Sequence, residues 1–267
     1  MKFQLLALDL DGTLLEEDLT IPSNTIDRLR RLIQIGVTVT LSTGRMFPSA
    51  KIYADMIGTS APLITYNGAV IRRRMDKEPI FTSYVPRVDM EAVIKFCKRT
   101  GYYLQLYNND QIVVEKKVWQ TEIDPDLRNV PCLEVNDFST AKLGDTPKMM
   151  IVTDPSDVPN VHRMLYESVG QDLYIAASQP YLVEMMRAGT SKTSALIRLC
   201  NWLQIPREAV ICCGDHSNDI DMIEWAGIGA AVGNAIDPLK EKADYTAMAP
   251  RSQGVNEIID FFFGTSV

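Results

Sequence analysis

The chain is poor in the residues that define several common protein classes. Only two of its 267 residues are histidine, and its five cysteines are odd in number and form no Cys-x-x-Cys pair. We therefore expect no disulfide scaffold, no zinc ribbon and no histidine-rich metal site. Unpaired thiols of this kind favour a reducing compartment, so we expect a cytoplasmic protein.

Long apolar runs and an excess of basic residues are also missing. No stretch approaches the roughly 20 apolar residues that cross a bilayer, and Asp9 and Asp11 interrupt the apolar start, so we expect neither a membrane span nor a signal peptide. Lys and Arg total 27 against 34 Asp and Glu, a net charge of −7. Such a chain lacks the field that attracts nucleic acid or an anionic membrane.

What the chain does have is a globular composition, 46% apolar, with an alternating pattern of strands and helices. Residues 3–10, 37–41 and 62–66 have the composition of buried strands, and 22–36 and 47–57 that of the helices between them. Alternation of this kind with short connections predicts βαβ units, and hence a doubly wound parallel sheet with helices on both faces.

The pattern changes in the middle of the chain and then returns. A hairpin is expected over 69–84, mixed helices and strands follow, and the first rhythm resumes with a helix over 191–203 and a strand over 209–213. We therefore predict an α/β core formed by 1–84 and 188–267, with a second, α+β domain inserted at 85–187.

Polar clusters stand at the ends of three predicted core strands. They are Asp9-Leu10-Asp11-Gly12-Thr13, Ser42-Thr43-Gly44-Arg45 and Gly214-Asp215-His216-Ser217-Asn218-Asp219. Ligands of open α/β sheets bind outside the carboxyl ends of the strands, so these clusters should share one crevice. Lys192, at the start of the helix that returns to the core, could bring its ammonium group there.

The charges of these clusters predict a cation. Asp9, Asp11, Asp215 and Asp219 would crowd several negative charges together, which is costly unless a cation neutralises them. A few oxygen ligands suit Mg²⁺, which keeps waters and shares phosphate oxygens with a substrate. Thr43 and the N–H groups that follow it are natural phosphate donors.

Two better-known motifs fit these residues less well. An EF-hand loop starting at Asp9 needs Gly and Glu where the chain has Leu14 and Thr20. A Walker A loop ending at Lys192 needs Gly where the chain has Ser191. Neither a calcium loop nor a nucleotide loop is therefore expected.

The ordered combination of the four elements resembles the haloacid dehalogenase-like phosphohydrolase superfamily, and within it the Cof-type branch with a C2B-type α/β cap. The resemblance covers essentially the whole chain. It implies that Asp9 is the nucleophile that forms an aspartyl-phosphate and that Asp11 is the acid/base. It places Mg²⁺ on the Asp9 carboxylate, the main-chain carbonyl of Asp11 and Asp215.

The same resemblance assigns the other candidate residues. It implies that Asp219 supports the site, and it leaves two departures from the branch pattern, Thr193 after the lysine and His216 in the last loop. The residues implied to bind phosphate or substrate are Leu10, Thr43, Gly44, Lys192, Asn218, Arg45 and Asn67.

The function implied is an Mg²⁺-dependent phosphatase for small phosphomonoesters, such as sugar phosphates or phosphorylated cofactors. A phosphosugar mutase and a non-catalytic phospho-acceptor or ligand-binding regulator remain as alternatives. Tyr107, Trp119, Tyr181 and Glu184 of the insert are candidates for choosing the leaving group, but the sequence does not show where they point. It makes no prediction of the substrate's identity or of the oligomeric state.

Overall fold

The structure is a computed structural model that describes residues 2–118, 130–169 and 172–265. The chain forms two compact units. The first, called here the core unit, comprises Met1–Phe81 and Ser191–Val267, and the second, the insert unit, comprises Thr82–Thr190. The core unit is thus built from both ends of the chain, with the insert unit between them in sequence.

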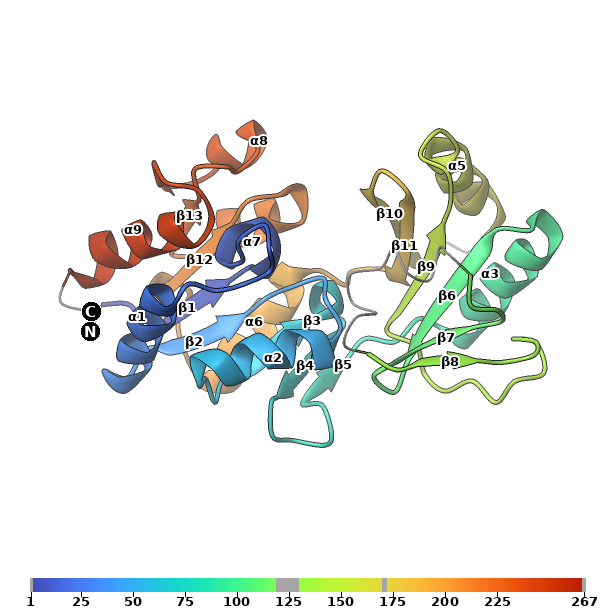
Figure 1. Ribbon diagram of the computed structural model, residues 1–267, viewed down its shortest axis with the longest axis horizontal. Helices are drawn as coiled ribbons and strands as arrows, with labels where there is room; N and C mark the ends of the chain where they lie inside the picture. Colours follow the sequence, from blue (N-terminus) through green and yellow to red (C-terminus); the bar gives the residue numbers. More distant parts are fainter. Residues whose placement is uncertain (1, 119–129, 170–171, 266–267) are drawn as a thin grey trace. The chain divides into compact units, whose positions relative to one another are not determined.

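A parallel sheet of five strands forms the centre of the core unit, in the order β14-β13-β12-β1-β2 (Figure 1). β1 lies between β12 and β2, and all its residues are buried. Fully apolar strands are expected where helices cover both faces of a parallel sheet. The strands are β1 (Leu5–Leu8), β2 (Thr38–Leu41), β12 (Val210–Gly214), β13 (Ile228–Ala231) and β14 (Tyr245–Thr246).

Helices flank this sheet because successive strand residues point to opposite faces. Leu5 and Ala7 pack against Leu196 of α6 and Ile223 of α7. Leu6 and Leu8 therefore face the other side, on which α1, α2 and α9 pack together. The helices are α1 (Ser23–Gln34), α2 (Phe47–Ile57), α6 (Lys192–Leu203), α7 (Ile220–Trp225), α8 (Asp237–Lys240) and α9 (Arg251–Phe263).

A smaller antiparallel sheet, β3-β4-β5, continues the core unit beyond β2. A parallel bridge between Ser42 and Ile64 joins it to the residue that follows β2. This small sheet corresponds to the third predicted strand and the predicted hairpin. Its strands are β3 (Pro62–Thr65), β4 (Val70–Arg73) and β5 (Phe81–Thr82).

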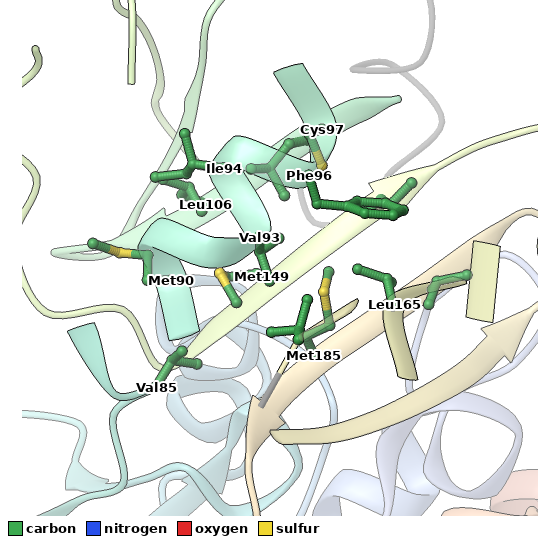
Figure 2. Packing of buried hydrophobic residues seen from close by; sticks show 14 of the residues in the cluster. Val85, Met90, Val93, Ile94, Phe96, Cys97, Leu106, Met149, Leu165 and Met185 are labelled. Atoms are coloured by element: carbon green, nitrogen blue, oxygen red, sulfur yellow. The ribbon is translucent and has the colours of Figure 1, made fainter. Parts of the chain in front are cut away.

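The insert unit has its own mixed sheet of six strands, β10-β11-β9-β6-β7-β8, and in its described residues two helices accompany this sheet. Alternate strand residues, such as Leu106, Met149 and Met185, pack against α3 and α5 in a separate hydrophobic core (Figure 2). The elements are α3 (Arg87–Thr100), β6 (Tyr103–Asn108), β7 (Gln111–Val114), β8 (Cys132–Glu134), β9 (Lys148–Val152), α5 (Val158–Ser168), β10 (Leu173–Gln179) and β11 (Leu182–Arg187).

The predicted fold class is confirmed: a parallel α/β core carries a separate α+β insert with a mixed sheet. None of the helices in the described part of the chain is long and apolar enough to cross a membrane.

Candidate active site

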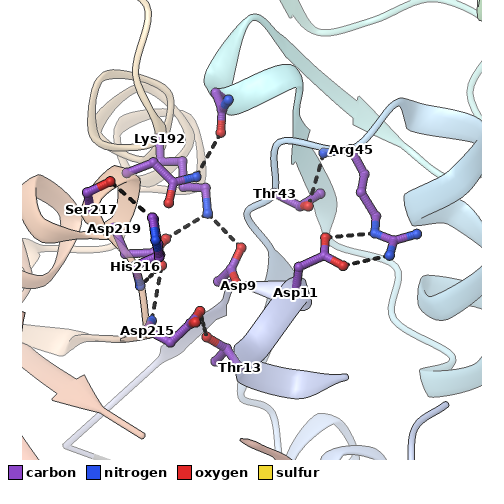
Figure 3. Close-up of polar contacts among 12 residues, drawn as sticks. Asp9, Asp11, Thr13, Thr43, Arg45, Lys192, Asp215, His216, Ser217 and Asp219 are labelled. Carbon is purple, nitrogen blue, oxygen red and sulfur yellow. Dashed lines mark hydrogen bonds and ion pairs between the residues drawn. The ribbon is translucent and has the colours of Figure 1, made fainter. Parts of the chain in front are cut away.

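The carboxyl ends of three neighbouring strands form the site. β1 is paired with β12 and β2 in a register that places Leu8 beside Cys213 and Leu41. The residues that directly follow these strands, Asp9, Asp215 and the Ser42–Arg45 loop, are therefore adjacent, as Figure 3 shows for Asp9, Asp215 and Thr43. The sheet's parallel order thus brings together three segments that are far apart in sequence.

Lys192 links two of the carboxylates. Its Nζ donates to Oδ1 of Asp9 and to Oδ1 of Asp219, each at 2.6 Å (Figure 3). The lysine side chain is only 1% exposed. It occupies the first position of α6, which begins there because Ser191 and Ser194 form a reciprocal cap. The capped helix start therefore aims the ammonium group at the end of β1.

Burial dominates the electrostatics of this group. Desolvation raises the pKa of Asp9 well above its ordinary value, against the attraction of Lys192. Desolvation also raises the pKa of Asp215, and the negative charge of Asp219 adds to the effect. Burial by itself would lower the pKa of Lys192, but the charges of Asp219 and Asp9 outweigh it and raise that pKa. One ammonium is therefore shared by an acidic cluster that holds more negative charge than it can neutralise.

Asp219 and Asp215 are held by short-range contacts. Oδ2 of Asp219 accepts from the N–H groups of Asp215, at 3.1 Å, and His216, at 3.2 Å. Thr13 donates its hydroxyl to Oδ1 of Asp215 at 2.9 Å. Gly12 has φ of +84°, and a Cβ there would lie 2.2 Å from Oδ2 of Asp215. The turn after β1 thus packs directly against the Asp215 carboxylate, which only glycine allows.

The acidic cluster can hold a metal ion. Asp9, Asp215 and Asp219 each offer a carboxylate oxygen, and these oxygens lie within 4.8 Å of one another. Carboxylate oxygens with uncompensated charge suit a hard divalent cation. Because Asp219 already accepts from Lys192 and two N–H groups, Asp9 and Asp215 are the better placed ligands. The residues present therefore fit a bound cation.

The carboxylate of Asp11 is bound by a different cation, the guanidinium of Arg45. Both of its carboxylate oxygens accept from Arg45, from Nε at 2.8 Å and from Nη2 at 2.6 Å. Arg45 is 5% exposed, donates to Ser49 and lies over the ring of Tyr53, whereas the Asp11 side chain is 51% exposed. A buried guanidinium thus orients a carboxylate that faces solvent.

A strained turn between β3 and β4 joins the remaining candidates. Tyr66 and Asn67 both have φ of +52°, which non-glycine residues seldom adopt. The Asn67 N–H donates to the carbonyl of Thr43 at 3.0 Å, and its Oδ1 accepts from Nδ2 of Asn218 at 3.1 Å. Such strain persists only where surrounding contacts enforce it. Through these two hydrogen bonds, Asn67 connects the Thr43 loop to the loop that contains Asn218.

Two more candidates contribute through the main chain. The Leu10 side chain is fully buried in the core unit, so only its backbone can contact a ligand. Gly44 lies against the Asn67 side chain, where a Cβ would approach Oδ1 at 3.0 Å. The structure thus places every predicted site residue at one edge of the sheet, although their roles remain predictions.

Sequence reasoning missed Asn234. Its Nδ2 donates to the carbonyl of Gly12 at 2.8 Å, and its Oδ1 accepts from the N–H of Arg251 at 2.8 Å. Asn234 follows β13, so the rule that found the other clusters at strand ends also identifies this residue.

Of the leaving-group candidates in the insert, two lie on the sheet face away from α3 and α5. Glu184 accepts from Nζ of Lys148 at 3.1 Å, and Nζ lies 4.6 Å from the ring centroid of Tyr107. All three side chains are buried, and Lys148 was not predicted. Tyr181 lies in the turn between β10 and β11, and Trp119 lies outside the described residues.

Comparison with known families decides the identity. The model of a family of haloacid dehalogenase-like hydrolases matches residues 6–259. The chain belongs to this family. The predicted resemblance is confirmed, and the matched region contains all the candidate site residues.

Relatives of this haloacid dehalogenase-like hydrolase share its whole length. The Bacillus subtilis 5-amino-6-(5-phospho-D-ribitylamino)uracil phosphatase YitU is 29% identical over 265 residues, covering 97% of each chain. A haloacid dehalogenase-like hydrolase structure from Bacteroides thetaiotaomicron has a TM-score of 0.92 at 28% identity, covering 98% of this chain and 100% of that one. A subclass IIB sugar phosphatase has a TM-score of 0.82 at 25% identity, covering 97% and 99%. The insert is therefore part of the shared architecture, and the predicted resemblance to the Cof-type branch with its cap is confirmed.

In this haloacid dehalogenase-like hydrolase, we predict that Lys192→Met lowers the free energy of unfolding by about 3 kcal/mol at neutral pH, because it leaves two buried carboxylates unpaired. Losing the ammonium raises the pKa of Asp9 further, so the folded variant binds more protons than the unfolded chain. The stability of the variant therefore falls as pH rises. Its loss in free energy of unfolding relative to the parent is smaller at mildly acidic pH than at neutral pH. Urea unfolding at the two pH values measures this.

The control is Lys242→Met, since the ion pair of Lys242 with Glu224 is exposed. We expect that variant to keep nearly the parent's free energy of unfolding at both pH values, because solvent screens an exposed ion pair. If Lys192→Met lost the same free energy of unfolding at both pH values, the loss would not come from unpaired carboxylates, and the prediction would be wrong.

We also predict that Gly12→Ala weakens metal binding, because the added Cβ displaces the Asp215 carboxylate. Gly36→Ala is the matched control, since Gly36 has φ of +95° but no atom within 4 Å of its Cβ position. Both variants bear the strain of about 1 kcal/mol for a side chain at positive φ. We expect an added divalent cation to raise the unfolding temperature of the parent and of Gly36→Ala, but not that of Gly12→Ala, in differential scanning calorimetry. Equal metal responses in the two variants would show that Gly12 does not position Asp215.

Proposed function

We propose that the chain is a magnesium-dependent phosphatase that hydrolyses small phosphomonoesters, such as sugar phosphates or phosphorylated cofactors, through an aspartyl-phosphate on Asp9. The observation that carries this proposal is the Asp9 carboxylate itself. Lys192 binds its Oδ1, and within the described residues no hydrogen bond reaches its Oδ2. That oxygen is therefore available to attack phosphorus.

The charge balance supports a divalent cation. Four carboxylates gather here, those of Asp9, Asp11, Asp215 and Asp219, and among the described residues the cationic side chains that bind them are Lys192 and Arg45. A phosphate dianion would add further negative charge. In our proposal, Mg²⁺ is held by the carboxylates of Asp9 and Asp215 and the main-chain carbonyl of Asp11. When bound, it offsets the charge on the transferring phosphoryl oxygens.

The first half-reaction transfers the phosphoryl group to the protein. Oδ2 of Asp9 forms a bond to phosphorus as the bond to the leaving oxygen breaks, and protonated Asp11 donates its proton to that oxygen. The Thr43 hydroxyl, the N–H groups of Leu10 and Gly44, and the Lys192 ammonium bind the phosphoryl oxygens.

The second half-reaction releases phosphate. Asp11, now ionised, accepts a proton from a water molecule as the water oxygen attacks phosphorus. The bond between phosphorus and the Asp9 oxygen breaks, which regenerates the Asp9 carboxylate and leaves Asp11 protonated for the next cycle.

The remaining core residues orient these groups. Arg45 fixes the direction of the Asp11 carboxylate, and one of its two hydrogen bonds has to break before Asp11 carries a proton on that oxygen. Asn67 and Asn218, joined side chain to side chain, bind substrate beside the Thr43 loop. Asp219 holds Lys192 in place.

The insert, residues 85–187 in our proposal, serves as the cap that selects the leaving group. The buried Lys148–Glu184 pair and the adjacent Tyr107 support this role. Burying a charged pair costs desolvation free energy, so a pair kept inside the insert unit indicates a function there. The relatives described above are phosphatases of different phosphorylated small molecules, a phosphoribitylaminouracil and a sugar phosphate, so the proposal extends to this class of substrates. The five unpaired cysteines support a cytoplasmic location.

We predict that Asp9→Asn reduces phosphate release from p-nitrophenyl phosphate at least about 1,000-fold, since it removes the nucleophile. Asp9→Glu, which keeps the charge but moves the carboxylate, should be similarly impaired. Malachite-green detection of phosphate, with and without Mg²⁺, measures both variants and the metal requirement.

Asp27→Asn, an exposed acid on α1, is the control and should keep the parent rate. Circular dichroism checks that each variant is folded. A folded Asp9→Asn variant with the parent rate would exclude Asp9 as nucleophile, and isomerised sugar phosphate without phosphate release would favour a mutase.

A further inference from the structure

A hollow lies on the core unit, between β4, β5 and α6. Its volume is about 310 Å³, within the range of small-molecule sites. Ile71 and Leu199, both buried, belong to the hydrophobic core beneath it. Phe81 and the 36%-exposed Ile80 line it from the β5 side, and the 47%-exposed Trp202 from α6. The hollow therefore has an apolar floor and aromatic walls.

Two arginines lie against the aromatic rings of this hollow: Arg198 is part of its lining, and Arg73 contacts the lining residue Trp202. Arg198 of α6 places its guanidinium carbon 4.3 Å from the ring centroid of Phe81, on the opposite wall. The guanidinium carbon of Arg73, on β4, lies 4.8 Å from the ring centroid of Trp202. Each guanidinium thus covers an aromatic ring from the facing element, which fixes its plane.

These two cations differ from the neighbouring arginines in having no polar partner. Among residues 2–118, 130–169 and 172–265, no hydrogen bond or ion pair involves the side chain of Arg73 or Arg198. By contrast, Arg74 pairs with Asp55, and Arg72 donates to the carbonyl of Asp76. Both guanidiniums therefore keep their N–H donors for a ligand, Arg198 in the lining of the hollow and Arg73 beside its Trp202 wall.

This hollow is separate from the site at Asp9. Lys192 and Trp202 lie on the same helix, at its first turn and its last. At 1.5 Å per residue, their separation of ten positions amounts to about 15 Å along the helix axis. A ligand in the hollow would not occupy the Asp9 site.

We propose that this hollow binds a small planar anion, an aromatic ring that carries a sulfonate, carboxylate or phosphate group. The ring occupies the apolar space between Phe81 and Trp202, and the anionic group accepts from Arg73 and Arg198. Planar guanidiniums match such oxyanions with paired N–H donors. A second copy of the chain fits less well, because a two-fold contact would place the same arginines against each other.

Isothermal titration calorimetry with 1-naphthalenesulfonate tests this. We expect saturable binding of one molecule per chain. The neutral 1-naphthalenemethanol and inorganic sulfate should each bind at least about tenfold more weakly, because the first lacks the anionic group and the second lacks the aromatic ring. Because the assay measures binding without turnover, its result does not depend on the proposed phosphatase activity.

Matched variants locate the site. Arg73→Gln and Arg198→Gln should each weaken binding of the sulfonate about tenfold, the loss of one charge-assisted hydrogen bond. Arg198→Lys, which keeps the charge, should retain most of the affinity, and Arg31→Gln on α1 should bind as the parent does. All four variants should keep the parent rate with p-nitrophenyl phosphate.

Three outcomes would overturn the proposal. Absence of saturable binding would show that the hollow takes no such ligand. Equal binding of 1-naphthalenemethanol would show an apolar groove without anion recognition. Unchanged affinity in folded Arg73→Gln and Arg198→Gln variants would place the bound sulfonate elsewhere on the protein.

Discussion

The ammonium group of Lys192 allows two carboxylates, those of Asp9 and Asp219, to share a buried position at the end of the central strand. Without it, their burial would cost several kcal/mol per charge. The local structure serves this contact: Ser191 caps the helix so that it begins at Lys192, and Gly68 leaves room where a Cβ would lie 2.1 Å from the Ser191 carbonyl oxygen. The remaining negative charge is what makes the site receptive to a divalent cation and then to phosphate.

Much of this arrangement could be predicted from the order of residues along the chain. Apolar strands that end in Asp9, Thr43 and Asp215 imply convergence, because parallel strands present their carboxyl ends at one edge. Lys192 is 183 positions from Asp9, yet its place at the start of the helix after the insert indicated where it would return. The family comparison and the two-unit architecture confirm the fold that these positions implied.

Other features depend on side-chain direction, which sequence patterns do not contain. Arg45 was a candidate substrate ligand, and the structure shows its guanidinium on both oxygens of Asp11. That pairing depends on a rotamer set by Ser49 and Tyr53, one and two helical turns further along α2. The Lys148–Glu184 pair joins adjacent strands whose register is decided only when the insert sheet forms.

The central claim is that an oxygen of Asp9 forms a bond to phosphorus. The stereochemical course of hydrolysis tests it most directly, with a thiophosphate monoester made chiral at phosphorus by oxygen isotopes and hydrolysed in water of a third isotope. Two successive in-line displacements, first by Asp9 and then by water, predict retention of configuration. Inversion would mean that water attacks the substrate in a single step, and it would contradict the account.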